Sequence, residues 1–229
     1  MRCCGCAVGA LVLVVLVAVG AAAYFGFVPG VSSVIGTDKP RDLGVRYTPQ
    51  DANGVYGKAQ VQVSQPELLC IGCQVEYSGR QPVETRFTQA EISALLNAQN
   101  QKYGALRNIQ VKFNADQTVE FTALAAREPS VPIYVKAIPK VGRGGKLDLT
   151  VVSVEAGRVP IPLSVLSQYV GGADVEDGLH EISDEILKQA GILELTDLRV
   201  EAGQIYFKGI VAKTAKGVAP PPGAPAATK

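Results

Sequence analysis

The sequence predicts an α+β protein in which one N-terminal transmembrane helix precedes a domain of antiparallel strands and two main helices. Three observations indicate this fold class. Residues 7–28 form an uncharged apolar stretch, two later segments have the apolar spacing of amphipathic helices, and several others alternate apolar and polar residues. Because the strands follow one another as hairpins, an antiparallel sheet is expected rather than a doubly wound parallel sheet.

The apolar stretch at residues 7–28 consists mostly of Val, Leu, Ala and Gly. A helix of about 22 residues, rising about 1.5 Å per residue, is long enough to cross a hydrocarbon core of about 30 Å. A cleaved signal peptide is the alternative, with Ala21, Ala22 and Ala23 as its cleavage site. Under both interpretations the rest of the chain lies outside the cytoplasm. We therefore expect a single-pass protein of the cell membrane.

Composition divides the remainder of the chain. Pro29, Gly30 and Gly36 interrupt any regular period after the apolar stretch, and the end of the chain is rich in Pro and Ala. The predicted organisation is a cytoplasmic stub (1–6), the membrane anchor (7–28), a linker (29–40), an extracytoplasmic α+β domain (41–213) and a disordered Pro/Ala-rich tail (214–229).

Charge and motifs exclude several function classes. Lys and Arg number 22 against 21 acidic residues, and there is no Trp, so no nucleic-acid partner is expected. The chain has no GxSxG, P-loop or HExxH motif. His180 is the only histidine, and we interpret it as part of the solvated face of a helix. No catalytic residue, metal site or cofactor is predicted.

The five cysteines form two groups. Cys70 and Cys73 are spaced as CxxC in the exported region. After them, Val75 and Tyr77 alternate with polar residues, which is the pattern of a strand. A structural disulfide is expected there, with a redox pair or half of a metal site as alternatives. The second group, next to the predicted anchor, consists of Cys3, Cys4 and Cys6. These cysteines are either acylated or occur there by chance, without a function.

The clearest helix signal begins at Thr88. Thr88 fits an N-cap and Glu91 follows at the spacing of a capping box. Phe87 and Ile92 are placed as a hydrophobic staple, and Gly104 is a suitable terminator. The apolar stripe of this helix is Ile92, Leu95 and Leu96. A shorter helix is expected to start with Thr48 as cap and Pro49 in its first turn.

After Gly104 the apolar period changes to two. Residues 108–114 and 119–123 alternate on either side of a turn at 115–117, which predicts a β-hairpin. Two further strands are expected around 131–135 and 147–151, joined by a glycine-rich turn. The C-terminal part then predicts a short helix at 163–169, a longer one of about 16 residues with its apolar positions between 175 and 186, and a second hairpin from 195–200 and 205–211.

These patterns carry a family resemblance. The segments concerned are Phe87-Thr88-x-x-Glu91-Ile92-Ser93-Ala94-Leu95-Leu96-Asn97, Val111-Lys112-Phe113-Asn114-Ala115-Asp116, Ala156-Gly157-Arg158-Val159-Pro160-Ile161-Pro162 and Leu198-x-Val200-x-x-Gly203-x-Ile205-x-Phe207-x-Gly209. They resemble YpmS-like bacterial membrane-anchored proteins and are similar to exported TULIP-like phospholipid-binding domains. The cysteines and the Pro-rich tail depart from that pattern.

The resemblance implies a curved antiparallel sheet wrapped around two main helices, with an apolar groove between them. It implies a non-enzymatic binding module for a lipid or fatty-acyl ligand at the membrane. The alternative is an envelope structural domain with a closed core that docks a protein partner. The residues expected to line the groove are Ile92, Leu95, Leu96, Leu179, Ile182 and Ile186.

Overall fold

The structure is a computed structural model, and it describes residues 15–22, 32, 37–65, 68–69, 74–101, 104–125, 130–162, 187 and 190–218. This part of the chain is an α+β structure whose strands are mostly antiparallel, as the sequence predicted. The predicted helices at 163–169 and 175–186 lie outside the described residues. In chain order the elements are α3 (Asp51–Ala59), β1 (Gln62–Ser64), β2 (Val75–Ser78), β3 (Gln81–Thr88), α4 (Gln89–Asn100), β4 (Leu106–Phe113), β5 (Val119–Ala125), β6 (Pro132–Val141), the 3-10 turn η2 (Arg143–Gly145), β7 (Leu147–Ala156), β8 (Val159–Pro160), β9 (Ile192–Glu201), β10 (Gln204–Val211) and β11 (Thr214–Gly217).

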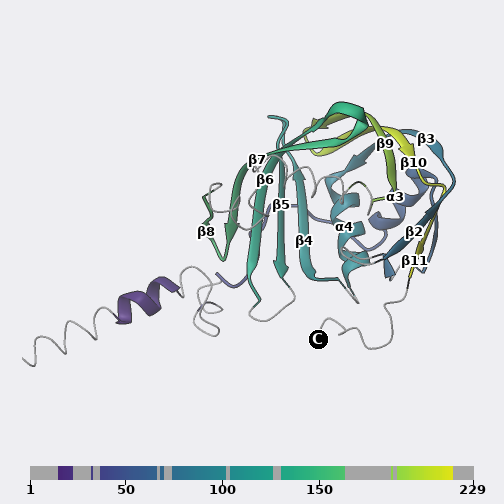
Figure 1. The fold of residues 1–229 in the computed structure, drawn as a ribbon. Coiled ribbons are helices and arrows are strands. Elements are labelled where there is room, and N and C mark those ends of the chain that lie inside the picture. The colour runs from purple at the N-terminus through teal and green to yellow at the C-terminus, as the bar shows by residue number, and fades with distance from the viewer. Residues whose placement is uncertain are drawn as a thin grey trace, which may run out of the picture.

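The largest sheet is the five-stranded meander β4-β5-β6-β7-β8, in which each strand pairs antiparallel with its neighbour in sequence (Figure 1). Alternation explains its inner face: Ile109, Val111 and Phe113 of β4 are buried. The hairpin predicted from residues 108–123 and the two strands predicted after it are therefore confirmed.

A second antiparallel sheet has the order β3-β10-β9, and its β9–β10 hairpin confirms the C-terminal prediction. Strand β3 was not predicted, although Val83, Thr85 and Phe87 alternate along it. Pro82 lacks an amide hydrogen and discourages a strand assignment at this position. It is accommodated because β3 lies at the edge of the sheet.

The third sheet corrects the predicted end of the domain. Its order is β1-β11-β2, with β11 parallel to β1 and antiparallel to β2. Strand β11 covers 214–217, so the domain extends beyond residue 213 and the first residues assigned to a disordered tail are part of a sheet. In this sheet Ala215 is 5% exposed, which explains why the chain stays ordered past the predicted boundary.

Helix α4 begins as predicted. The Glu91 amide donates to Thr88 Oγ1 over 3.2 Å, and the Thr88 amide donates to Glu91 Oε2 over 2.8 Å, which completes the capping box. Helix α3 begins later than predicted, at Asp51 rather than after Thr48. The Asp51 carboxylate accepts hydrogen bonds from the Thr48 amide and hydroxyl, so these two residues organise the turn that leads into the helix.

Two groups of apolar residues form the core. One joins the β3-β10-β9 sheet to β7 and contains Val83, Leu147, Leu187, Leu195, Phe207 and Val211. The other lies between α4, β4, β5 and β9 and contains Ile109, Val111, Phe113, Ala123 and Val200. Strand β9 also contacts β6 directly, which brings the second sheet against the five-stranded sheet.

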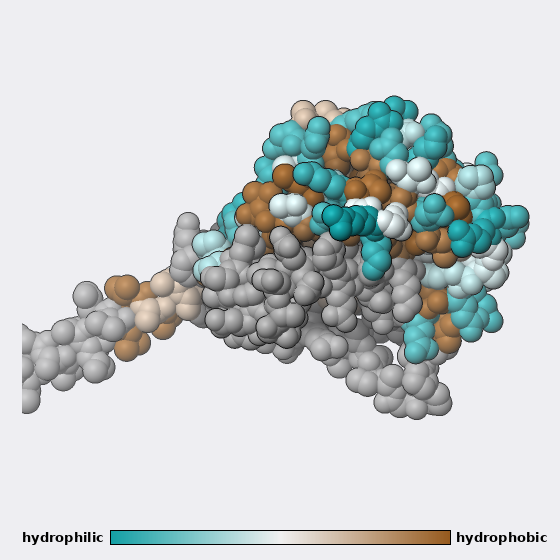
Figure 2. Space-filling view, turned by 45° about the horizontal axis from the view of Figure 1, so that its top comes forward, coloured by the Kyte–Doolittle hydropathy of each residue, from teal (hydrophilic) through white to brown (hydrophobic). Residues whose placement is uncertain are grey.

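Residues 15–22 of the predicted anchor are helical. Their side chains Val15, Leu16 and Val17 are 51%, 65% and 63% exposed, and Figure 2 shows this apolar segment standing apart from the domain. Within the described residues, no helix has both the length and the apolar character needed to span a membrane. The predicted linker is not uniformly exposed, because Ser32 and Thr37 are buried and the Thr37 amide donates to the Ser32 carbonyl.

Candidate functional site

Helix α4 lies along the open edge of β4, and three of its polar side chains bond to the β4 backbone. These side chains recur every four residues on the helix, a rise of about 6 Å. On β4 they bond to alternate residues, which lie about 6.8 Å apart along the strand. The spacing along the helix and the spacing along the strand therefore nearly match. The pairs are Gln89 with Phe113, Ser93 with Val111 and Asn97 with Ile109. The helix thus covers a strand edge that would otherwise expose unpaired backbone groups.

Strand β4 departs from regular pairing close to the end of α4. Arg107 pairs with Leu124 and Gln110 with Thr122, so two residues of β4 face one residue of β5. This β-bulge includes Asn108, whose φ of 53° is left-handed, a conformation that Asn adopts more readily than most residues.

A cleft of about 470 Å³ lies between the C-terminal half of α4 and this bulged end of β4. One part of its lining is apolar and another part carries carboxamides. The described residues that line it are Tyr47, Pro49, Ala94, Asn97, Ala98, Asn100, Gln101, Leu106, Arg107 and Asn108. The sequence patterns did not predict this site. The series Gln89, Ser93 and Asn97 at intervals of four, beside the apolar stripe, was the signal available for it.

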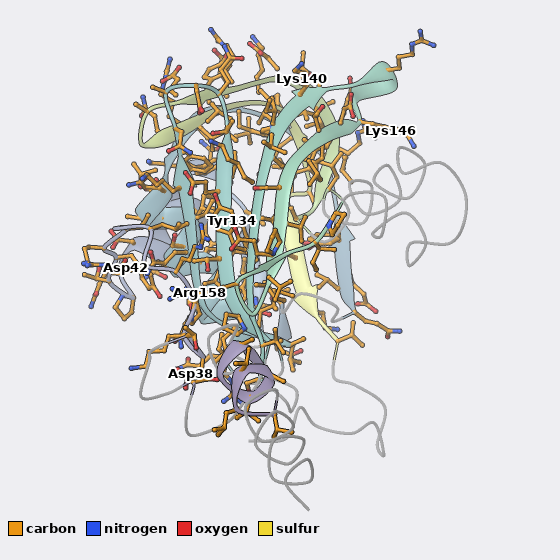
Figure 3. All side chains as sticks on the ribbon, turned by 90° about the vertical axis from the view of Figure 1, so that its left-hand side faces the viewer. Asp38, Asp42, Tyr134, Lys140, Lys146 and Arg158 are labelled. Carbon is orange, nitrogen blue, oxygen red and sulfur yellow. The ribbon has the colours of Figure 1, made fainter. Side chains whose placement is uncertain are left out.

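The cleft is at the end of the five-stranded sheet that is nearest the N-terminal helix. Strand register establishes this position through the pairs Leu106–Ala125, Leu124–Pro132 and Ile133–Ala156, which place the start of β4 level with the β7–β8 turn. In Figure 3, Arg158 of that turn and Asp38 lie toward the helix of residues 15–22, whereas Lys140 and Lys146 lie at the opposite end.

Asn100, one of the residues that line the cleft, has a buried acceptor without a partner. Its side chain is 2% exposed, and its Nδ2 donates to the Leu96 carbonyl over 2.8 Å, but its Oδ1 accepts no hydrogen bond. A buried polar atom without a partner costs about 1–3 kcal/mol. Gly104 lies against this side chain, and a Cβ at position 104 would come within 2.5 Å of the Asn100 Cα. Glycine therefore leaves room for the Asn100 carboxamide.

Arg107 is the charged member of the described lining. Its side chain is exposed and makes no ion pair or hydrogen bond within the part of the chain that the structure describes. No acidic residue is among the described residues that line the cleft. The local charge is therefore positive. Across the cleft, burial raises the pKa of Tyr47 despite its hydrogen bond with Asn97, so the phenol stays protonated at neutral pH.

The predicted apolar groove is only partly within the described structure. Ile92 and Leu96 are half-buried and pack against the core around Ile109, while Leu95 is half-buried. None of these three lines the cleft, which lies beside Ala94 and Ala98 of the same helix. The other predicted groove residues, Leu179, Ile182 and Ile186, lie outside the described residues, as do Cys70 and Cys73.

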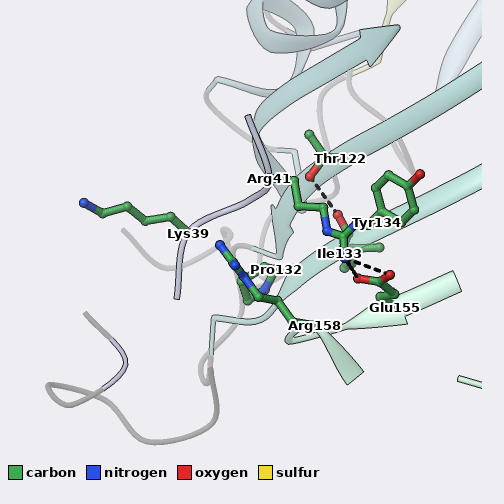
Figure 4. Close-up of a pocket in the computed structure, with 8 residues that line it drawn as sticks. All are labelled: Lys39, Arg41, Thr122, Pro132, Ile133, Tyr134, Glu155 and Arg158. Carbon is green, nitrogen blue, oxygen red and sulfur yellow. Dashed lines mark hydrogen bonds and ion pairs between the residues drawn. The ribbon is translucent and has the colours of Figure 1, made fainter. Parts of the chain in front are cut away.

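A second concavity lies at the β7–β8 end of the sheet and is lined by Lys39, Arg41, Thr122, Pro132, Ile133, Tyr134, Glu155 and Arg158 (Figure 4). Its volume of about 10 Å³ is no more than one water molecule needs. Arg41 Nη2 lies 2.7 Å from Glu155 Oε2, and its guanidinium carbon lies 4.7 Å from the centre of the Tyr134 ring. The residues thus fill the space with one another, which is typical of a structural contact.

Tyr134 is not suited to proton transfer. Burial, together with its hydrogen bond to the Glu120 carboxylate, raises its pKa to about 12. The phenol therefore stays protonated at neutral pH and donates to Glu120 Oε2 over 3.0 Å. Among the described residues, no three His, Cys, Asp or Glu side chains are grouped so that they could hold a metal ion.

Comparison with protein-family models, with curated proteins and with solved structures finds no match to this chain.

Proposed function

We propose that this protein is a membrane-anchored, extracytoplasmic binding module for a lipid or another apolar ligand, and that it is not an enzyme. The observation that carries the proposal is the cleft between α4 and β4. Its volume of about 470 Å³ is within the range of small-molecule sites, which is about 300–1,000 Å³. It opens at the end of the sheet that is nearest the N-terminal helix.

The mixed lining of the cleft favours an amphiphilic ligand. Ala94, Ala98 and Leu106 provide apolar surface, and the exposed carboxamides of Gln101 and Asn108 provide hydrogen-bonding groups beside it. Each buried methylene contributes about 0.8 kcal/mol, so about ten methylenes offset the entropic cost of association. We expect wide tolerance of acyl-chain length, because apolar contacts alone discriminate weakly.

The membrane anchor is supported by the uncharged residues 7–28 and by the exposed apolar side chains of residues 15–22. A bilayer that holds this segment would face the end of the sheet where the cleft opens. The width of five strands, at about 4.8 Å each, keeps the start of β4 within about 20 Å of β8. The cleft would then open on the side of the domain that faces the bilayer.

The finer fold assignment is part of the same proposal. We propose a TULIP-like, YpmS-like domain in which the sheet curves around α4 and a second long helix. The position of α4 along β4 supports this arrangement, as does the packing of Ile92 and Leu96 against the strands. The second helix corresponds to residues 175–186, from which Leu179, Ile182 and Ile186 would extend the apolar surface.

Topology is tested first. A protease added to intact spheroplasts should digest the region after Pro29, because the proposal places it outside the cytoplasm. A reporter enzyme that is active only in the cytoplasm, fused after Lys229, should be inactive. Activity of that reporter would refute the extracytoplasmic location.

Ligand binding is tested by photolabelling the full chain in cells that have incorporated a diazirine fatty acid. Peptides from residues 94–108 should carry label. Ala98→Trp, which fills the cleft from an exposed position of α4, should remove this label. Ala115→Trp, at an exposed position of the β4–β5 turn, should leave it unchanged. Label confined to residues 7–28 would mean that lipid contacts only the anchor.

One observation favours a second candidate, an envelope domain with a closed core that docks a protein partner. Ile92 and Leu96 lie against buried residues of β4 and β5 and are already partnered. If label never reaches the cleft, cross-linking at the same Ala98 position should capture a protein instead.

A further inference from the structure

Three exposed cations gather at the β7–β8 end of the five-stranded sheet, on the side of the domain where the N-terminal helix lies. Lys39, Arg41 and Arg158 line the same small concavity, and all three residues are exposed (Figure 4). We call these three residues the basic rim. In Figure 3, Arg158 lies toward the helix of residues 15–22.

The carboxylates beside the basic rim are recessed. The Glu155 side chain is 16% exposed, whereas that of Arg41, which pairs with it over 2.7 Å, is 45% exposed. Asp38, the acidic neighbour of Lys39, is half-buried, and its Oδ1 is shielded from solvent. The cations therefore face solvent while the nearby carboxylates are set back, so the outer surface of this end is positive.

Arg158 occupies a backbone position that suits glycine better than arginine. Gly157 and Arg158 connect β7 to β8 with φ values of 55° and 66°, so both are left-handed. This is the arrangement of a type I′ turn, in which Asn-Gly and Gly-Gly are preferred. A Cβ is disfavoured in this conformation, so the geometry of the turn does not account for an arginine at its second position.

The length of the chain keeps the basic rim close to the predicted anchor. Lys39 follows Val28 by 11 residues, which span about 37 Å at most when extended. The distance is shorter than this, because the Thr37 amide donates to the Ser32 carbonyl over 2.9 Å and turns part of the connection back.

The other end of the sheet is also basic, with Lys140, Arg143 and Lys146 exposed around η2. Strand β7 is 10 residues long, so it separates the two ends by about 33 Å. Charges interact over about 8–10 Å at physiological salt. Only the end beside the anchor can therefore respond to charge on the bilayer that holds it.

We propose that the basic rim docks on anionic lipid headgroups of this bilayer, so that the domain rests on the membrane by its β7–β8 end. The inference rests on the proposed membrane anchor. The concavity of about 10 Å³ is too small to enclose a phosphate, so the cations suit a surface that presents many phosphates. Each cation close to an anionic bilayer favours the docked state about fivefold.

The test uses the full chain in nanodiscs of phosphatidylcholine, with or without phosphatidylglycerol. The chain has no Trp, so Pro160→Trp places a single fluorophore beside the rim, and Val141→Trp places one at the opposite end. Both positions are exposed. A nitroxide on the lipid headgroup should quench Pro160→Trp more strongly when phosphatidylglycerol is present, and about 0.5 M salt should remove the difference. Val141→Trp should be quenched weakly in both discs.

Charge variants carrying the Pro160→Trp reporter identify the residues responsible. Lys39→Gln combined with Arg158→Gln should lower the ratio of docked to undocked protein about 25-fold in discs with phosphatidylglycerol. Lys140→Gln combined with Arg143→Gln is the matched control, which removes the same charge from the opposite end and should leave quenching unchanged.

Two further variants separate docking from folding. Glycine suits a φ of 66°, so Arg158→Gly should be at least as stable as the wild type and yet dock about fivefold less. Arg158→Lys keeps the charge and should dock like the wild type. Unchanged docking of Arg158→Gly would show that this arginine does not contact the bilayer surface.

The outcomes distinguish the docking surface from the anchor. Equal quenching of Pro160→Trp in both kinds of disc, or equal losses in the two double variants, would overturn docking and leave the anchor intact. Stronger quenching of Val141→Trp than of Pro160→Trp would mean that the opposite end faces the bilayer, and would also overturn it. Extraction of the full chain from vesicles by alkaline carbonate would refute the anchor, and the docking surface with it.

Discussion

Asn97 of α4 satisfies both backbone polar groups of Ile109 in β4. Its Nδ2 donates to the Ile109 carbonyl over 2.6 Å, and its Oδ1 accepts from the Ile109 amide over 3.0 Å. The carboxamide therefore takes the place of a neighbouring strand at the open edge of the sheet. Together with Gln89 and Ser93, this side chain covers the edge of the strand, and it also lines the cleft.

Removing this contact should destabilise the protein. Ile109 is fully buried, so Asn97→Ala leaves its amide and carbonyl without partners, and we expect a loss of about 1–3 kcal/mol in the free energy of unfolding. The measurement is urea denaturation of the full chain in detergent, followed by circular dichroism. Gln99→Ala is the control, since it removes only a bond to the Tyr56 hydroxyl. Equal losses in the two variants would show that the Asn97 contact is not specially stabilising.

The capping box predicts a second difference. Thr88→Ala removes the oxygen that accepts from the Glu91 amide, and should cost about 1 kcal/mol. Thr88→Ser keeps an oxygen at that position and should cost much less. The same denaturation measurement compares them, and a similar loss in both would attribute the effect to the Thr88 methyl group rather than to the cap.

Stability should fall in acid partly through Glu91. Burial alone would raise its pKa, but the hydrogen bonds from Lys58 and Thr88 outweigh burial and lower the pKa below its ordinary value of 4.5. Because the pKa is lower in the folded state than in the unfolded state, this stabilisation is complete above about pH 4.5 and is lost as the pH falls through the folded-state pKa. Glu91→Gln should therefore lower stability at pH 7 and make its decline below pH 4.5 shallower.

The pH dependence is measured as urea midpoints between neutral pH and acid. Glu76→Gln is the control for the loss of one negative charge, because its carboxylate is exposed and lies 3.9 Å from Lys216. Parallel pH profiles for wild type and Glu91→Gln would contradict the assignment.

Replacement by alanine should affect stability differently at two glycines of α3. Gly57 has open space where a Cβ would lie, so Gly57→Ala should stabilise the helix by about 0.5–1 kcal/mol. A Cβ on Gly54 would lie 2.6 Å from Glu91 Oε1 and would displace the carboxylate of the capping box. Gly54→Ala should gain less or lose stability. If thermal unfolding shows equal gains, α3 and α4 are less closely packed than described.

The disulfide remains a sequence-based prediction. In an oxidising compartment Cys70 and Cys73 should be paired, so a thiol reagent added to unreduced, denatured protein should leave both unmodified. Reduction before labelling is the control and should expose both. Full labelling without reductant, or stoichiometric zinc, would contradict it.

Local signals in the sequence determined the α+β class, the start of α4, the β4–β7 meander and the β9–β10 hairpin. Each depends on neighbours in the chain, such as Thr88 with Glu91 or the alternation of Ile109, Val111 and Phe113. These interactions are encoded within a few residues, so periodicity and capping reveal them.

Tertiary structure alone decided the remaining strands and the cleft. Strand β11 is short, and Ala215 is ordered by pairing with Val63 and Tyr77, which are distant in sequence. The cleft requires the end of α4 to meet a bulge in β4, and no local pattern brings these two distant segments together. Apolar spacing shows that Ile92 and Leu96 face inward, but which side chains remain unpartnered depends on how the helix docks against the strand edge.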